Sequence, residues 1–158
     1  MNLRSKHGYE TLLYDFIKEV LVVCPVCNAQ AIVLGNGLRQ DGDSYIETRI
    51  TCSSCGYNKY WKETNTNDRR GMIVGAPIDP YFHLPLWLQI PVGENTLWAY
   101  NYDHLRFLKE HIGANLRERN DLPLLNRSIA SRLPKWMTSK KNRATVIQSI
   151  ERLTEQSK

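Results

Sequence analysis

The chemistry available to this sequence is concentrated in its cysteines, which occur as two Cys-x-x-Cys pairs. Cys24 and Cys27 form the first pair, Cys52 and Cys55 form the second, and the 158-residue chain has no other cysteine. Such pairs can form disulfides, act as catalytic dithiols or bind a metal ion. The 24 residues between the pairs hold two strand-like stretches joined by a Gly-rich turn, which is long enough to return the second pair to the first. The spacing therefore predicts one tetrahedral metal site with these four thiolates as ligands.

Two other uses of the cysteines fit the sequence less well. A redox dithiol is expected as one Cys-x-x-Cys pair at the start of a helix in a βαβ unit, whereas here two matched pairs flank strands. Structural disulfides are uncommon in a reducing cytosol. Iron accepts the same four thiolates, so the ligands alone do not choose between zinc and iron. We favour one Zn²⁺ per chain over iron or disulfides because of the type of site and the expected compartment. Four protein ligands leave no position open for water or substrate, so this zinc would be structural.

The composition predicts a cytoplasmic protein. Hydrophobic residues make up 42% of the chain and charged residues 23%, which is enough for one ordinary globular core. No apolar run approaches the roughly 18 residues that a membrane span needs. Residues 1–15 contain charges and no apolar stretch of the kind that a secretory signal requires. We therefore expect no membrane partner.

The spacing of apolar residues predicts the elements that position the cysteines. Helical spacing between residues 8 and 20 predicts an amphipathic N-terminal helix, whose apolar face consists of Tyr9, Leu12, Leu13, Phe16, Ile17 and Val20. Short strands are expected at 31–34, 44–52 and 57–61, with a turn at 35–37. These strands would form a three-stranded antiparallel ribbon around the metal.

The rest of the chain is expected to be irregular at first and then helical. Four prolines between residues 72 and 100 exclude a continuous helix or a central strand there, although short edge strands fit. We interpret the six aromatic residues between 81 and 102 mainly as core. Helices are expected at 103–119, 128–133 and 142–155, the last with Asn142 as its N-cap.

The predicted fold class is therefore α+β, in three parts that pack together. Residues 1–62 would form the N-terminal helix and a three-stranded antiparallel zinc ribbon. Residues 63–102 would form a Pro- and aromatic-rich connecting segment, and residues 103–158 a mainly helical C-terminal part. Neither end of the chain offers a large core by itself, so one packed unit is expected.

The cysteine pairs, with strands between them and "YNKYW" after them, resemble a zinc ribbon of the transcription-factor-IIB type over residues 22–62. The remainder, with "DPYFHLPLWL", "LWAYNYDHL" and "SRLPKWM", is similar to small uncharacterised bacterial proteins that carry an N-terminal zinc ribbon. The resemblance implies the ribbon fold and its metal. In many such families it also implies contact with nucleic-acid machinery, whereas other ribbons are protein-docking modules.

The positive charge of the chain lies in its last third. Residues 101–158 carry 12 Lys+Arg and 6 Asp+Glu, against 9 and 10 in residues 1–100. Between Leu122 and Ile150 there is no acidic residue, and the basic residues around Trp136 are Arg127, Arg132, Lys135, Lys140, Lys141 and Arg143. Such a set can bind nucleic-acid phosphates, and an aromatic side chain among them can stack on a base. The alternative is a solvated basic face with Trp136 anchored in the core.

No catalytic constellation is recognisable. His104 and His111 are seven residues apart on one predicted helix, each preceded by an acidic residue. Adjacent residues on a helix do not face each other, and no Gly-rich phosphate loop or nucleophile motif accompanies them. We interpret both as surface histidines and predict no enzymatic activity.

Two functions fit this sequence. One is a zinc-binding module associated with nucleic acid through the basic C-terminal region. The other is a protein–protein adaptor or inhibitor, for example an immunity-type protein, that docks through the ribbon edge and the aromatic segment. Salt separates the two, because phosphate contacts weaken steeply with salt and an apolar interface hardly changes.

Overall fold

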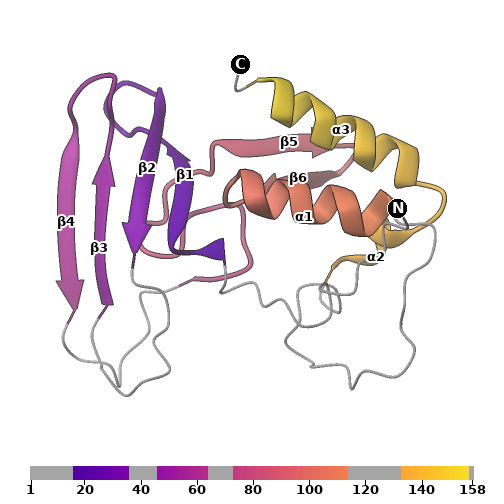
Figure 1. Cartoon of the computed structure of the whole chain (residues 1–158), viewed down its shortest axis with the longest axis horizontal. Helices are drawn as coiled ribbons and strands as arrows, with labels where there is room; N and C mark the ends of the chain where they lie inside the picture. The colour runs from indigo at the N-terminus through magenta and orange to yellow at the C-terminus, as the bar shows by residue number, and fades with distance from the viewer. Residues whose placement is uncertain (1–15, 36–45, 64–72, 114–132, 157–158) are drawn as a thin grey trace. The chain divides into compact units, whose positions relative to one another are not determined.

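A computed structural model describes residues 16–35, 46–63, 73–113 and 133–156 of the chain (Figure 1). The chain divides into two compact units. The sheet unit comprises the described part of residues 14–89 together with Trp98–Asn101, and the helical unit comprises Ile90–Leu97 and the described part of residues 102–158. The elements in chain order are β1 (Glu19–Val23), β2 (Gln30–Gly35), β3 (Ile46–Thr51), β4 (Asn58–Glu63), β5 (Leu88–Val92), β6 (Asn95–Ala99), α1 (Tyr102–Gly113), α2 (Lys135–Thr138) and α3 (Arg143–Glu155).

The first four strands form one antiparallel sheet in which each strand pairs with its neighbour in the sequence (Figure 1). The register places Val33 of β2 opposite Val20 of β1 and Ile50 of β3. All three side chains are fully buried. Their β-branched shape favours the extended backbone and at the same time builds the core on this face of the sheet.

The Pro- and aromatic-rich segment before β5 completes this core. The Tyr81 ring lies against Gly35 at the end of β2, where a Cβ atom would overlap the ring. The Tyr81 hydroxyl donates to the carbonyl of Ile17 at 2.9 Å. Of the six aromatic residues between 81 and 102, Tyr81 and Tyr100 are buried and the other four are partly buried. The interpretation of this segment as core is consistent with that burial.

A buried carboxylate shapes the loop that carries Tyr81. Asp79 Oδ1 accepts hydrogen bonds from the amides of Tyr81 at 2.9 Å and Phe82 at 2.6 Å, and Oδ2 accepts one from the amide of Leu84 at 2.6 Å. Burial raises the pKa of Asp79, while the three amides and the neighbouring His83 act to lower it. The loop therefore closes around one side chain, which holds Tyr81 in position against β2.

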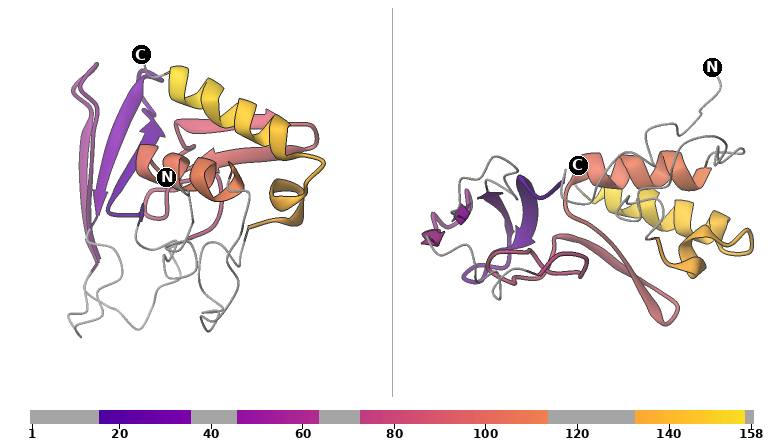
Figure 2. Two further views of the ribbon diagram at one scale, coloured as in Figure 1. Left: turned by 45° about the vertical axis from the view of Figure 1, so that its right-hand side comes forward. Right: turned by 90° about the horizontal axis from the view of Figure 1, so that it is seen from below.

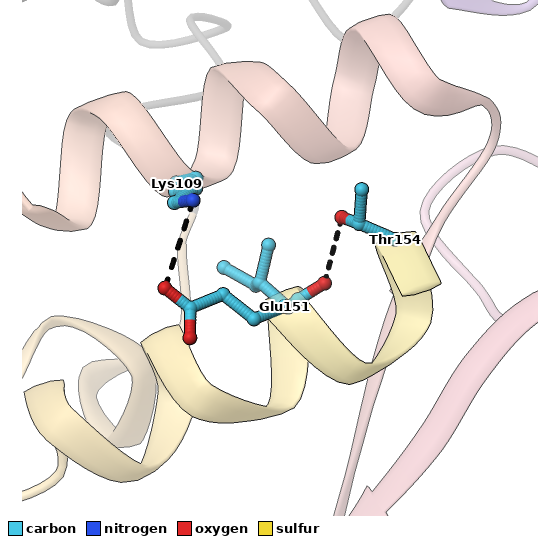
Figure 3. A network of polar contacts seen from close by, with 4 residues as sticks. Lys109, Glu151 and Thr154 are labelled. Atoms are coloured by element: carbon cyan, nitrogen blue, oxygen red, sulfur yellow. Dashed lines mark hydrogen bonds and ion pairs between the residues drawn. The ribbon is translucent and has the colours of Figure 1, made fainter. Parts of the chain in front are cut away.

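In the helical unit, α1 and α3 lie side by side (Figures 1 and 2). The Lys109 Nζ of α1 lies 3.6 Å from Glu151 Oε1 of α3, and Thr154 Oγ1 donates to the carbonyl of Ile150 at 2.9 Å (Figure 3). Both members of the ion pair are half exposed, so the pair adds little stability. The buried stripes hold the helices together instead: His104, Leu105, Leu108, His111 and Ile112 on α1, and Val146, Ser149, Ile150 and Leu153 on α3.

The fold class differs from the expected one. Instead of a three-stranded ribbon with an N-terminal helix and a mainly helical C-terminal part, the described chain is mostly β, with strands in a four-stranded and a two-stranded antiparallel sheet and three short helices. The predicted N-terminal helix is wrong at its end, where β1 occupies Glu19–Val23, and its beginning lies outside the described residues. Val20 fits both a helical stripe and an apolar run. Pairing with β2 decides for the strand, because it buries that run on a sheet.

The connecting segment contains a regular hairpin despite its prolines. β5, which includes Pro91, pairs with β6 in the two-stranded sheet. Each strand of such a pair has one unpaired edge, so a residue without an N–H group can face outward at no cost to the ladder. Short edge strands were one of the two structures expected for this segment.

The predicted helices of the C-terminal part are found in part. α1 confirms the helix expected from residue 103, up to Gly113, where the description ends. The helix expected at 128–133 lies outside the described residues except for Leu133, which is not helical, and α2 begins after Pro134. Asn142 is at the N-cap of α3, as predicted, but its side chain makes no capping hydrogen bond. No helix in the described ranges has the length and apolar character needed to cross a bilayer.

Candidate metal centre

The two cysteine pairs lie on the two turns at one end of the four-stranded sheet. The turn with Cys24 and Cys27 connects β1 to β2, and the turn with Cys52 and Cys55 connects β3 to β4. In an antiparallel sheet of consecutive strands, these two connections fall at the same end (Figure 1). The sheet topology therefore brings together two segments that are far apart in the sequence, as the spacing predicts.

The four sulfur atoms form a compact cluster. All of them lie within 4.8 Å of one another, with Cys24 Sγ 3.7 Å from Cys55 Sγ and Cys27 Sγ 3.6 Å from Cys52 Sγ. Four sulfurs about 2.3 Å from a central ion at tetrahedral angles lie about 3.8 Å apart. The cluster is thus close to the size that one tetrahedrally coordinated ion needs. Among the described residues it is the one such group of three or more metal-binding side chains.

The two turns have the same backbone structure, and each will be called a knuckle, comprising residues 24–28 and 52–56. The amide of Asn28 donates to the Cys24 carbonyl at 3.0 Å, and the amide of Gly56 donates to the Cys52 carbonyl at 2.9 Å. Asn28 and Gly56 follow the second cysteine of each pair, and both have a left-handed backbone, with φ of 63° and 79°. Glycine and asparagine are the residues that adopt this conformation at least cost. The sequence of each knuckle therefore suits its turn.

Backbone amides point at the first sulfur of each knuckle. The amide of Val26 lies 3.4 Å from Cys24 Sγ. Burial acts to raise the pKa of Cys24, but the amides of Cys27 and Val26 outweigh it and the pKa is lowered. In the second knuckle the amide of Cys55 is the main cause that lowers the pKa of Cys52 to about 7. The lowered pKa of both first cysteines favours the thiolate, which is the form that binds a metal.

The second cysteine of each knuckle shows the opposite direction. The amide of Ala29 acts to lower the pKa of Cys27, but burial and the Cys52 thiol outweigh it and the pKa is raised. The amide of Tyr57 likewise acts on Cys55, whose pKa is nevertheless raised to about 12 by burial and the other three thiols. The pKa values thus shift in opposite directions within each knuckle, because thiolate charge on one sulfur disfavours charge on its neighbours. A bound cation would favour the thiolate form of all four sulfurs.

The cluster is closed on one side and open on the other. Cys24 and Cys52 are buried at 0% and 1% exposure, whereas Cys27 and Cys55 are exposed. Four sulfurs occupy every position of a tetrahedron, so an ion held there has no place for a water or substrate ligand. The residues present therefore fit a metal ion with a preference for sulfur, in a site that supports the fold.

The predicted basic residues are described in part. Lys135, Lys140 and Lys141 are exposed and Arg143 is partly buried, all on α2, on the turn to α3 or at the start of α3. Arg127 and Arg132 lie outside the described residues. The first turn of α3 contains no acidic residue. Four of the six predicted residues thus fall within ten positions around the corner between α2 and α3.

Asn142 and Trp136 close that corner. The Asn142 side-chain amide donates to the Trp136 carbonyl at 2.9 Å and makes no capping hydrogen bond to α3. Trp136 is partly buried, which is intermediate between an exposed ring that stacks on a base and a ring anchored in the core. The Arg143 Nε is buried and has no hydrogen-bond partner among the described residues.

His104 and His111 were predicted at the surface, and this prediction is wrong. His104 and His111 are each 2% exposed on the inner face of α1. Burial lowers the pKa of His104 to about 3, so its ring is neutral near pH 7. His111 stacks on Phe107, with ring centroids 6.0 Å apart. Asp103 contacts Arg106 at 3.3 Å on the exposed side of the helix. The buried face of α1 therefore includes the two histidines as well as its aliphatic residues.

Sequence patterns did not reveal an exposed apolar surface on the sheet. Ile32 and Leu34 of β2 and Tyr60 of β4 are 39%, 53% and 48% exposed. The register places Leu34 opposite Arg49 and Arg49 opposite Tyr60, and the Arg49 guanidinium lies 5.6 Å from the Tyr60 ring centroid. In β2 every position from 31 to 34 is apolar, so the alternation that marks an exposed face is absent from the sequence.

Comparison of the chain with models of protein families, with curated proteins and with solved structures found no match.

Proposed function

We propose that the protein is a non-enzymatic module in which Cys24, Cys27, Cys52 and Cys55 bind one structural Zn²⁺. The observation that carries this proposal is the arrangement of four thiols on two matched knuckles, with sulfur–sulfur distances close to those of a tetrahedral site. Zinc takes four thiolates without imposing another geometry. Iron takes the same ligands, and metal analysis separates the two. When bound, the ion supplies charge neutralisation and a cross-link.

The role of the ion follows from the topology. One knuckle belongs to the β1–β2 hairpin and the other to the β3–β4 hairpin, so the ion ties two hairpins that are otherwise joined through the pairing of β2 with β3. A site of this kind is not preformed in the unfolded chain. The free energy of metal binding is therefore part of the free energy of folding.

The test is the metal content of the purified full-length chain, measured by plasma mass spectrometry. We expect one zinc per chain, and loss of zinc together with a lower melting temperature in Cys27→Ser. Ser54→Ala is the matched control, because it changes an exposed knuckle residue and leaves the four sulfurs in place. Full metal content and an unchanged melting curve in Cys27→Ser would contradict the assignment.

We further propose that the corner between α2 and α3 binds nucleic acid through phosphate contacts. Lys135, Lys140 and Lys141 are exposed there, and no ion pair joins them to an acidic side chain of the described residues. The absence of acidic residues from the first turn of α3 leaves the positive end of the helix dipole uncompensated. Lysine binds phosphate mainly by charge and releases counterions when it does so. The expected binding is weak, sensitive to salt and independent of sequence.

Fluorescence anisotropy with labelled random-sequence DNA and RNA, single- and double-stranded, tests this proposal. Three duplex phosphate contacts would weaken binding about 40-fold between 50 and 200 mM salt. Lys140→Glu/Lys141→Glu should abolish binding. Lys59→Glu/Lys62→Glu makes the same change of charge at exposed positions of β4 and should retain binding. Equal loss in both variants would mean that only net charge matters, and no binding at low salt would remove the proposal.

The exposed surface of Ile32, Leu34 and Tyr60 favours a second candidate function, a protein-docking module. Exposed apolar side chains grouped on one sheet face are a common feature of protein interfaces. A complex formed through them should survive 200 mM salt, unlike one formed through phosphates. Leu34→Arg should release a partner that the wild-type chain retains in an affinity pull-down, while Lys140→Glu/Lys141→Glu should not. The opposite pattern would assign the partner to the basic corner.

A further inference from the structure

We propose that the cysteine cluster is also a site of oxidative modification, at which a hydroperoxide converts the four thiolates into two disulfides that bridge the knuckles, Cys24–Cys55 and Cys27–Cys52. This inference rests on the proposed metal function, since it describes what the same sulfurs do when an oxidant reaches them.

The reaction can begin because each knuckle exposes one sulfur-bearing residue. Cys27 and Cys55 are exposed, and Cys24 and Cys52 are buried. A metal-bound sulfur remains a thiolate, which is the nucleophilic form of cysteine. Thiolate character together with exposure is what makes a cysteine susceptible to peroxides. Oxidation should therefore start at the second cysteine of a knuckle, not at the first.

The positions of the sulfurs select the partner in the second step. Cys27 Sγ lies 3.6 Å from Cys52 Sγ, and Cys55 Sγ lies 3.7 Å from Cys24 Sγ. Each of these close pairs joins an exposed cysteine to a buried cysteine of the other knuckle. A disulfide requires closure to about 2.05 Å, a movement of about 1.6 Å for each pair. The buried cysteines are thus placed to act as resolving cysteines for the exposed ones.

The chemistry balances with two molecules of hydrogen peroxide. An exposed thiolate attacks one peroxide oxygen, the O–O bond breaks, and a sulfenic acid and hydroxide form. The buried thiolate of the other knuckle attacks the sulfenic sulfur, the S–S bond forms, and the S–O bond breaks with release of a second hydroxide. Two such sequences oxidise four thiolates by four electrons and reduce two peroxides to four water molecules, after uptake of four protons. The sulfurs then carry no charge, so they no longer hold the metal ion.

The predicted pairing has a structural consequence. Disulfides within the pairs, Cys24–Cys27 and Cys52–Cys55, would close two separate turns and leave the hairpins untied. The disulfides proposed here connect the β1–β2 hairpin to the β3–β4 hairpin, as the ion does. The oxidised chain should therefore keep its sheet without metal, and a reductant with added zinc should restore the starting state.

The experiment treats the zinc-loaded full-length chain with hydrogen peroxide and follows released zinc with a chromophoric chelator and remaining thiols with a thiol reagent. Disulfides are then mapped by proteolysis without reduction and mass spectrometry. We expect two peroxides consumed and four thiols lost per zinc released, with Cys24 linked to Cys55 and Cys27 to Cys52. Circular dichroism should show that the oxidised, metal-free chain retains its sheet.

Three results would overturn the inference: disulfides within the knuckles, sulfinic or sulfonic acids as the main products, or oxidised chains that still hold zinc. Mapping uses the wild-type chain, so it does not depend on a variant that fails to fold. Metal analysis before peroxide addition separates the two proposals: a chain without zinc refutes the proposed function, and a zinc-bound chain with other products refutes only this inference.

Discussion

Asp79 offers a sharp test of how the sheet unit is held together. Its carboxylate accepts three amide hydrogen bonds of 2.6 to 2.9 Å, two at Oδ1 and one at Oδ2. In Asp79→Asn the Oδ1 atom can still accept from the amides of Tyr81 and Phe82. The new NH₂ group, however, would face the amide of Leu84, so two donors would meet where a donor and an acceptor meet now.

The expected change in the free energy of unfolding combines the loss of one hydrogen bond with a gain from removing a buried charge. A hydrogen bond to a charged group contributes about 1.5–3 kcal/mol, and an unsatisfied buried donor costs about 1–3 kcal/mol. Removal of the charge recovers part of this cost, because burial raises the pKa of Asp79 and so disfavours the ionised form. We expect Asp79→Asn to lower the free energy of unfolding by about 2 kcal/mol. Asp79→Ala, which leaves all three amides without an acceptor, should lower it by about 4 kcal/mol.

The assay is urea unfolding of the zinc-loaded chain at pH 7, followed by tryptophan fluorescence. Trp61, Trp87 and Trp98 all belong to the sheet unit, so the signal reports mainly on that unit. Glu94→Gln is the matched control, because Glu94 is an exposed carboxylate and should change stability by less than about 0.5 kcal/mol. The reasoning fails if Asp79→Asn behaves like this control, or if Asp79→Ala costs no more than Asp79→Asn.

Three further predictions concern the knuckles, the β2 glycine and the buried histidine. Gly56→Ala places a side chain in open space but at φ 79°, so backbone strain of about 1–2 kcal/mol should weaken zinc binding roughly 5- to 30-fold in a chelator competition, whereas Asn28→Gly should weaken it by less than about twofold. Equal affinity of Gly56→Ala and wild type would show that the knuckle does not need a left-handed residue there. Gly35→Ala should lower the urea midpoint, because its Cβ atom would overlap the Tyr81 ring, and the double variant Gly35→Ala/Tyr81→Leu should cost less than the sum of the two single changes. The pKa of His104 is about 3 in the folded chain and about 6.5 in the unfolded chain, so the unfolded state binds the extra proton between these values. The contribution of His104 to the free energy of unfolding is therefore fully present above pH 6.5. Below that pH it falls by up to about 1.4 kcal/mol per pH unit. Helix unfolding followed at 222 nm between pH 7.5 and 5 should show this slope, and His104→Leu should reduce it; an unchanged slope in His104→Leu would assign the acid sensitivity to other groups.

Local signals in the sequence were sufficient for several elements. β2, β3 and β4 were each predicted within a few residues of their observed bounds, because short apolar or alternating runs between turn residues have few other stable conformations. α3 was predicted from the spacing of Val146, Ile147, Ile150 and Leu153, and its N-cap position from Asn142. The pairing of Cys24 and Cys27 with Cys52 and Cys55 in one cluster followed from their spacing and the strands between them.

Other features depended on pairing that no local pattern specifies. Val20 of β1 fits both a helical stripe and a strand until β2 lies beside it. The prolines near β5 allowed irregular structure or short edge strands, and only the pairing of β5 with β6 decided for a hairpin. Asp79 carried no sequence signal, since its role comes from three amides of a loop that closes only in the folded chain. His104 and His111 were expected at the surface because no catalytic motif accompanies them, but they complete the buried stripe of α1.

The sequence by itself determined which residues can hold a metal, because the type and spacing of four cysteines are a chemical property of the chain. It also determined where the positive charge lies. Only the tertiary structure decided which cysteines are exposed, which sulfurs lie 3.6–3.7 Å from one another across the knuckles, and which side chains of β2 remain exposed. The physical reason is that exposure and sulfur–sulfur distance depend on the packing of segments distant in the sequence, whereas ligand chemistry and local turn conformation are carried by a few neighbouring residues.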